Sequence, residues 1–244
     1  MKRTLRLLKA LKPNLWFVFA IAAVITLAAP ARAQLTSITG LFTTGVNASG
    51  TALGNNIQES HYVITADTGG TPTGGGAYTV KSTALGAGWM ANPASGSRWV
   101  VADSGGSNPG NNPSRPAGTY DYTLTFSMPA GAQVWAVSIT GTGAADDSAS
   151  IYVNGILVSG QSLAGAGATS SFTLDSSNAT FNAGSNTITF KVNNTTSSAT
   201  GLLINSFAGT VNVPETAAYL PAAGAVSIYA VLALRRRLRK RRAG

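Results

Sequence analysis

The sequence predicts an all-β body, an antiparallel β-sandwich or jelly roll, flanked by an N-terminal signal helix and a C-terminal hydrophobic helix. Apolar and polar residues alternate in segments through the middle of the chain, clusters of Gly, Asn and Pro separate these segments, and each end carries an apolar run beside basic residues. No segment of the body has a capped 3.6-residue amphipathic pattern, so we expect few and short helices there. The expected organisation is a signal peptide at 1–33, a sandwich at 34–212 and a C-terminal sorting signal at 213–244.

The N-terminal segment has the parts of a secretory signal. Five basic residues precede an apolar run over residues 15–29, and Ala31-Arg32-Ala33 follows before Gln34. The small side chains of Ala31 and Ala33 match the A-x-A pattern that signal peptidase cleaves. The alternative is an uncleaved membrane anchor, which so short a run disfavours. We therefore expect export of a chain that begins at Gln34.

The strands of the body are predicted from alternation. Over residues 119–128, five large side chains share one sheet face, namely Tyr120, Tyr122, Leu124, Phe126 and Met128. The same pattern predicts a strand with Trp135, Val137 and Ile139 in the core, and another over 187–192. Asn154-Gly155 predicts a hairpin, because both residues accept the positive φ values of a type I′ turn. Further strands are expected at 61–66, 77–81, 98–102, 171–174 and 202–208, with exposed loops at 69–76 and 105–118.

The formal charge of +9 belongs to the two ends of the chain. The body from 34 to 213 has four basic and seven acidic side chains, a net charge of −3, so it is mildly acidic. A nucleic-acid partner is therefore not expected. Cysteine is absent, which excludes a disulfide framework and leaves stability to packing and bound ions.

The C-terminal 32 residues combine a short motif, an apolar segment and a basic cluster. The eighteen apolar residues at 217–234 would span about 27 Å as one helix, close to the roughly 30 Å of a bilayer core. A helix that started at Pro221 would span only about 21 Å. By the positive-inside rule the basic cluster stays in the cytoplasm and stops export. The cluster consists of Arg235, Arg236, Arg237, Arg239, Lys240, Arg241 and Arg242.

The order of Val213-Pro214-Glu215, apolar segment and terminal arginines resembles the PEP-CTERM sorting signal of Gram-negative bacteria that make exopolysaccharide. The resemblance implies that an exosortase-like enzyme removes the tail near the motif, after transient anchoring in the inner membrane. Thr216 departs from the family's usual second proline, and Pro221 interrupts the apolar segment. The bland alternative for the basic residues is a solvated tail.

A second resemblance covers the later half of the body. The segments 145–155, 181–188 and 201–204 are similar to galactose-binding-like jelly rolls, in which an acidic pair precedes a strand that ends in Val-Asn-Gly. The resemblance implies a carbohydrate-binding sandwich, in which the acidic pair Asp146-Asp147 is a candidate calcium loop. Carboxylate oxygens are the ligands calcium prefers; a solvated loop is the other interpretation.

The candidates for chemistry are few. His61 is the chain's one histidine, no Gly-x-Ser-x-Gly elbow accompanies it, and we expect an ordinary residue at a strand edge. Asp146 and Asp147 are adjacent, which suits two acids flanking one glycosidic bond poorly. Trp89 lies in a loop-like, glycine-rich segment and is a candidate for stacking on a sugar, although packing is the commoner role.

These observations predict a non-enzymatic protein that is exported across the inner membrane and delivered to the cell surface or matrix. Its expected partners are signal peptidase, an exosortase-like enzyme, the inner membrane and polysaccharide, with calcium as a possible cofactor. The alternatives are a glycan-active hydrolase and a structural coat protein without a ligand.

Overall fold

The computed structural model describes residues 33–69, 75–94, 96–103 and 108–214. The chain divides into two compact units, and the second, Leu35–Val213, holds nearly all of the described residues. The predicted signal helix and C-terminal hydrophobic helix lie outside them. Within the described ranges, no helix is long and apolar enough to cross a membrane.

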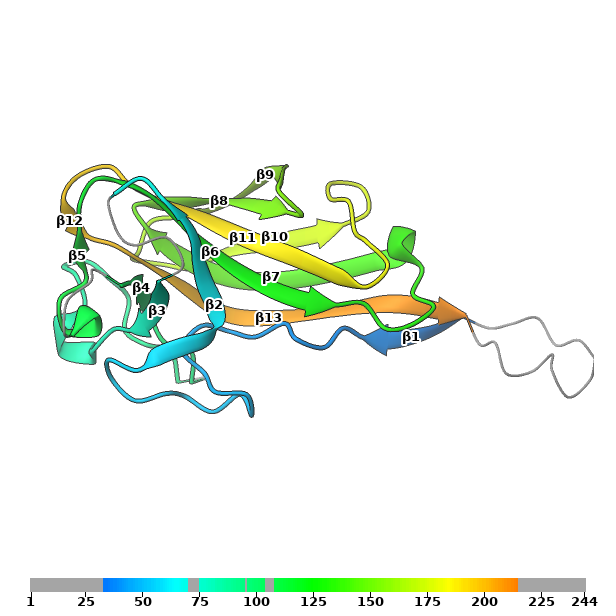
Figure 1. Cartoon of the computed structure of the whole chain (residues 1–244), viewed down its shortest axis with the longest axis horizontal. Coiled ribbons are helices and arrows are strands. Elements are labelled where there is room, and N and C mark those ends of the chain that lie inside the picture. Colours follow the sequence, from blue (N-terminus) through cyan, green and yellow to red (C-terminus); the bar gives the residue numbers. More distant parts are fainter. Residues whose placement is uncertain (1–32, 70–74, 95, 104–107, 215–244) are drawn as a thin grey trace, which may run out of the picture. The chain divides into compact units, whose positions relative to one another are not determined.

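The described residues of the second unit form antiparallel strands and three short 3₁₀ helices (Figure 1). In chain order the elements are β1 (Ala33–Ser37), β2 (Gln58–Asp67), β3 (Gly76–Thr79), η1 (Ser82–Ala84), β4 (Val100–Ala102), η2 (Pro109–Asn111), β5 (Ser114–Arg115), β6 (Gly118–Ser127), η3 (Val134–Ala136), β7 (Val137–Asp146), β8 (Ser148–Val153), β9 (Ile156–Ala164), β10 (Ser170–Asp175), β11 (Ser185–Asn194), β12 (Ser198–Ala199) and β13 (Gly201–Pro214).

Eleven of the described strands form one sheet that folds into two layers. The strand order is β10-β7-β13-β4-β3-β2-β6-β11-β8-β9, with β1 paired to β13 and a separate β12-β5 pair. The layers meet through aromatic rings: Phe172 of β10 and Phe190 of β11 pack edge to face with centroids 5.6 Å apart. Phe207 of β13 contacts the same Phe190 ring at 6.2 Å. The predicted antiparallel sandwich is confirmed.

Alternation predicted β6 and β11 well. Four of the five large side chains, Tyr120, Tyr122, Leu124 and Phe126, belong to β6 and are buried in the main core, and so is Met128 just after the strand. Ile188, Phe190 and Val192 of β11 are buried in the same core. The hairpin between β8 and β9 turns at Asn154 (φ 50°) and Gly155 (φ 79°), as the type I′ prediction requires. The register pairs Val153 with Ile156, so the turn has two residues.

Two predictions about single residues and loops are wrong. Trp135 was expected in the core but is 65% exposed, because the chain forms η3 there and β7 starts only at Val137. The 105–118 segment was expected to be an exposed loop, yet Arg115 within it is buried. Its guanidinium donates to the carbonyl oxygens of Ala102, Asn112, Ser114 and Pro109, and burial lowers its pKa. Residues 109–114 thus fold around a cation to which three of their carbonyl groups bind.

A smaller apolar cluster lies on the other side of β4, β7 and β13. Neighbouring residues of these strands are buried on opposite faces: Val100 and Leu202 belong to the main core, whereas Val101 and Leu203 belong to the smaller cluster. Such consecutive apolar pairs are typical of strands covered on both faces. The cover is the 82–99 segment, whose Trp89 and Met90 pack against the fully buried Trp99 cluster.

Candidate functional site

Three residues that the sequence singled out, Trp89, Asp146 and Asp147, lie near one end of β7. We call Trp89, Asp146, Asp147, Thr195 and Thr200 the carboxylate cluster. Asp146 is the last residue of β7 and lies opposite Gly201, the first residue of β13. Its Oδ2 accepts a hydrogen bond from the indole Nε1 of Trp89 at 2.6 Å. Two candidate residues that are 57 positions apart therefore contact each other directly.

Asp147 binds a different loop. Its Oδ2 accepts hydrogen bonds from the backbone N and the hydroxyl of Thr195, at 2.8 and 2.5 Å. The hydroxyl of Thr200, which is fully buried, donates to the backbone carbonyl of Asp146. The peptide bond between Asp146 and Asp147 is cis. The cluster thus ties the β7–β8 turn to the 82–99 segment and to the turn after β11.

The pKa values of the two carboxylates are shifted in opposite directions. Burial raises the pKa of Asp146 above its usual value, and the donors of Thr195 hold the pKa of Asp147 below its usual value. Each shift follows the rule that desolvation favours the neutral acid and hydrogen bonds to the anion favour the carboxylate. Asp146 therefore retains a proton to a higher pH than its neighbour does.

Trp89 is half-buried and held on three sides. Its ring lies 4.2 Å from the ring of Trp99 at a tilt of 34°, and Trp99 Nε1 donates to the carbonyl of Met90 at 3.0 Å. A Cβ added at Gly201 would lie 2.9 Å from the Trp89 ring, so only glycine leaves room for it there. The indole packs against the smaller cluster and stays partly exposed.

The carboxylate cluster does not offer a calcium ligand set by itself. In the ranges described, no group of three or more His, Asp or Glu side chains converges on a possible metal position. Calcium takes six to eight oxygen ligands, and one oxygen of each carboxylate already accepts hydrogen bonds within the chain. The two aspartates alone fit such a site poorly.

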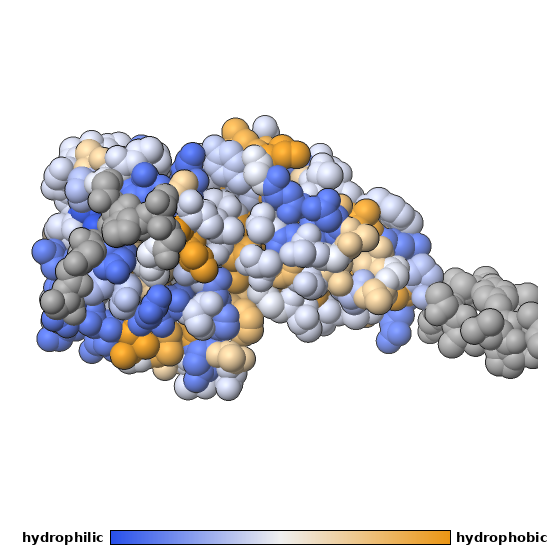
Figure 2. All heavy atoms as spheres, in the orientation of Figure 1, coloured by the Kyte–Doolittle hydropathy of each residue, from blue (hydrophilic) through white to orange (hydrophobic). Residues whose placement is uncertain are grey.

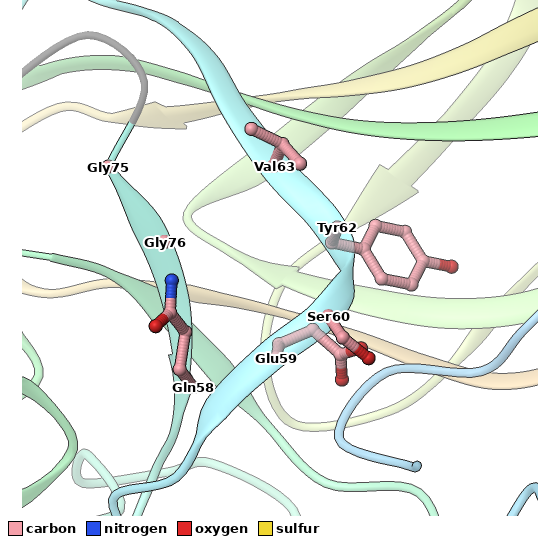
Figure 3. Close-up of a pocket in the computed structure, with 7 residues that line it drawn as sticks. All are labelled: Gln58, Glu59, Ser60, Tyr62, Val63, Gly75 and Gly76. Carbon is pink, nitrogen blue, oxygen red and sulfur yellow. The ribbon is translucent and has the colours of Figure 1, made fainter. Parts of the chain in front are cut away.

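A buried carboxylate, Glu59, was missed in the sequence analysis. It lies at the bend of β2, where the register with β3 shifts between Glu59 and Val63. Its oxygens accept hydrogen bonds from the backbone N of Gly45 at 2.5 Å and of His61 at 2.8 Å, and burial raises its pKa. Glu59 borders a pocket of about 380 Å³. The residues that line the pocket are Gln58, Glu59, Ser60, Tyr62, Val63, Gly75 and Gly76 (Figure 3). Both carboxylate oxygens accept hydrogen bonds from backbone N–H groups, so Glu59 fastens the 44–46 segment to the bend of β2. We call this contact the clamp.

His61 lies next to this clamp on β2. Its imidazole is half-buried and stacks face to face on Phe42, with centroids 3.7 Å apart. The hydrogen bonds of Asp146 and Asp147 go to Trp89 and Thr195 instead. The structure therefore places the histidine in a packing contact at the bend of the strand.

The outer face of the β2-β6-β11-β8-β9 layer carries an open polar surface that the sequence did not single out. We call it the threonine face: Thr65, Thr123, Thr189, Asp121, Lys191, Tyr152 and Leu157. The hydroxyl groups of Thr65, Thr123 and Thr189 form a hydrogen-bonded row across three strands, each contact 2.8 Å long. The row continues through Tyr152, which lies opposite Thr189, to Leu157.

The next row of this face carries its charges. Lys191 and Asp121 lie opposite each other and form an ion pair at 3.7 Å. The Lys191 ammonium also lies 5.7 Å from the centre of the Tyr152 ring. Figure 2 shows hydrophobic spheres over β9, where Ile156 and Leu157 are 59% and 50% exposed. The face thus combines hydroxyl groups, one ion pair and an aromatic ring with little net charge.

Comparisons with known proteins give no family. No family model matches the chain, and no curated protein matches it. Among solved structures, a family 29 carbohydrate-binding module complexed with mannohexaose is 10% identical, with a TM-score of 0.33, over 73% of this chain and 92% of that one. The CBM36-1 domain of a xylanase from the hindgut metagenome of Trinervitermes trinervoides is 12% identical (TM-score 0.25; 74% and 96%). A CBM36 module in complex with calcium and xylotriose is 13% identical (0.23; 73% and 95%). At TM-scores this low, the likenesses carry no argument about ligands.

Proposed function

We propose that the chain is an exported, surface-sorted, non-enzymatic β-sandwich protein that acts in an exopolysaccharide or biofilm matrix and binds glycans through the threonine face. The observation that carries the binding proposal is this face itself. Hydroxyl groups and a charged pair match the hydroxyl groups of a sugar, and the Tyr152 ring suits the apolar C–H side of a pyranose. Five neighbouring strands span about 19 Å, room for several sugar units of a chain.

The delivery part of the proposal is supported by the two ends of the sequence. The signal pattern before Gln34 accounts for export, and the motif, apolar segment and basic cluster after Val213 account for retention at the inner membrane and processing. Signal peptidase and an exosortase-like enzyme are the implied processing partners. Intact-mass measurement of surface material tests this part: the mature protein should lack both ends, and a mature chain that keeps residues 235–242 would contradict processing.

Glycan-array binding of the mature body tests the binding part. Tyr152→Ala should weaken binding about fivefold, because it removes a ring contact worth roughly 1 kcal/mol. The matched control is Thr140→Ala on β7, whose side chain is exposed on the other layer and should not affect binding. The assay is run with and without calcium, since Asp146 and Asp147 were the calcium candidates. No affinity for any glycan in either condition, with no association with isolated matrix, would refute glycan binding.

One observation favours a second candidate, a glycan-active hydrolase. The neighbouring carboxylates Asp146 and Asp147 have pKa values shifted in opposite directions, as paired acid and base groups do in glycosidases. This candidate predicts turnover of a polysaccharide that Asp146→Asn and Asp147→Asn each abolish. Release of reducing ends from matrix polysaccharide measures it, and binding without turnover leaves the first proposal in place.

A further inference from the structure

The first and last strands of the second unit, β1 and β13, bring its two chain ends side by side. β1 pairs with β13, and Figure 1 shows the two strands pointing in opposite directions, so β1 begins where β13 ends. The hydrogen bond from Ile38 N to Gly209 O, 2.8 Å long, fixes this alignment just after β1. Leu35 and Val213 are therefore neighbours. We call this region, with η3, the terminal end.

β13 separates the terminal end from the carboxylate cluster. Its first residue, Gly201, lies opposite Asp146, whereas Val211 lies opposite Val137 at the start of β7. A strand of fourteen residues at a rise of about 3.3 Å per residue is about 45 Å long. The cluster and the terminal end are thus at opposite ends of one rod-like strand.

The terminal end exposes two large apolar side chains. Trp135 of η3 is 65% exposed and Leu35 of β1 is 66% exposed. The backbone on both sides of Trp135 is fixed: Gln133 N donates to Asn212 O at 2.9 Å, and the Ser176 hydroxyl donates to the Trp135 carbonyl at 2.7 Å. The indole is therefore presented outward from a rigid support at the tip of β13.

The charge around these side chains is low. Among the described residues near them, the acidic one is Asp175, at the end of β10 and opposite Ser138, and its carboxylate accepts hydrogen bonds from Ser177. None of the four basic residues of the body belongs to β1, η3 or β13. A partner would therefore bind this end through apolar contacts and not through attraction of its anionic groups to basic side chains.

We propose that the terminal end contacts the surface of a lipid bilayer, with Trp135 and Leu35 at the level of the headgroups. Indole rings favour this interfacial layer. The sequence also predicts a membrane segment close to this end. The apolar segment starts at Ala217, three residues after Pro214, and three residues of chain reach at most about 10 Å. The inference rests on the membrane-anchoring part of the proposed function and not on glycan binding. With the terminal end at the bilayer, the carboxylate cluster at the other end of β13 points away from the membrane.

Brominated-lipid quenching of tryptophan fluorescence tests the contact. The full chain with Trp16→Phe, which leaves Trp89, Trp99 and Trp135, is reconstituted in phosphatidylcholine vesicles with and without lipids brominated near the headgroup end of their acyl chains. The Trp135 emission should shift to the blue and be quenched. Adding Trp135→Phe should remove most of the quenching, because the two remaining indoles lie in the smaller cluster. Leu35→Ser should weaken the quenching of Trp135.

A tryptophan moved to the opposite end provides the control. In the chain with Trp16→Phe and Trp135→Phe, Thr196→Trp places an indole on the exposed turn beside Asp147 and should stay unquenched. Equal quenching at positions 135 and 196 would overturn the proposal, as would an unquenched Trp135. A dimer that Trp135→Phe dissociates would also overturn it, because a second copy would then cover the indole. The vesicle measurement uses neither export nor glycans, so failure of export in cells would count against the proposed sorting alone.

Discussion

The carboxylate cluster and the threonine face contain similar polar groups but use them differently. In the cluster, the carboxylates of Asp146 and Asp147 accept hydrogen bonds from Trp89 and Thr195, which belong to distant loops. In the threonine face, the hydroxyl groups bond only to neighbours on adjacent strands, and the side chains stay partly open to solvent. A polar group that the fold itself uses is poorly available to a ligand. The comparison therefore favours the face as the binding surface and the cluster as a fastening.

This division makes opposite forecasts for substitutions. Changes in the cluster should cost stability, because they release the 82–99 segment and the turn after β11 from the β7–β8 turn. Changes in the face should cost binding and little stability, because exposed hydrogen bonds can be replaced by water.

Trp89→Ala should have the largest effect on stability. It removes the ring that packs on Trp99 and leaves Asp146 Oδ2 without its donor, so we expect the free energy of unfolding to fall by about 3 kcal/mol. Urea unfolding followed by circular dichroism measures the change. Trp89→Phe keeps most of the packing and loses the N–H group, and should cost about 1 kcal/mol. An Ala variant as stable as the parent would show that the cluster is not a fastening.

Asp147→Asn should lower the free energy of unfolding by about 1 kcal/mol at pH 7, because Thr195 donates to the carboxylate. The folded pKa of Asp147 is lowered, so its contribution is present above the ordinary value of 3.8 and is lost as the pH falls through the lowered pKa. The difference between parent and variant should therefore shrink in acid. Thermal unfolding between pH 7 and pH 2 measures this.

Asp146→Asn is the matched control for that titration, since its pKa shifts the other way. The raised folded pKa of Asp146 means that its contribution is present below its ordinary value and is lost as the pH rises through the folded pKa. The free energy of unfolding of the Asn variant, relative to that of the parent, should therefore be highest at neutral pH. The same trend in both variants would contradict the opposite environments of the two carboxylates.

The sequence was sufficient for the long strands and insufficient for the contacts between loops. Alternation located β6 and β11 because each buries one face only, so every second residue is apolar. The same rule failed at Trp135, because its spacing from Val137 matches a strand although the chain there turns as η3. Period alone does not show where a strand begins.

The candidate sites were harder to predict for another reason. Asp146 and Trp89 stood out by residue type, but their contact joins distant segments, and nothing local encodes it. The threonine face was missed because threonine is common in this chain and carries no distinctive motif. The register places Thr123, Thr189 and Tyr152 opposite one another on three strands, and the irregularity of β2 between Ile64 and Ala66 adds Thr65 to the row.

Lys191→Met tests the charged row of the threonine face. The side chains of Lys191 and Asp121 are 37% and 15% exposed, so breaking their ion pair should cost about 0.5–1 kcal/mol. Lysine lowers the pKa of Asp121, which burial raises, so the cost should be larger at pH 7 than at pH 4. A double-mutant cycle with Asp121→Asn isolates the pair, and a coupling of zero would show that Lys191 serves only the ligand or the Tyr152 ring.

Thr123→Val should have the smallest effect on stability, about 0.5 kcal/mol, because water can replace its two hydrogen bonds on the open face. The same substitution in the cluster, Thr200→Val, removes a buried hydroxyl that donates to the Asp146 carbonyl and should cost about 1–2 kcal/mol. Glycan binding should change in the reverse order, falling for Thr123→Val and not for Thr200→Val. Because the two variants make the same chemical change, equal losses of stability and of binding would show that the two regions do not differ in role.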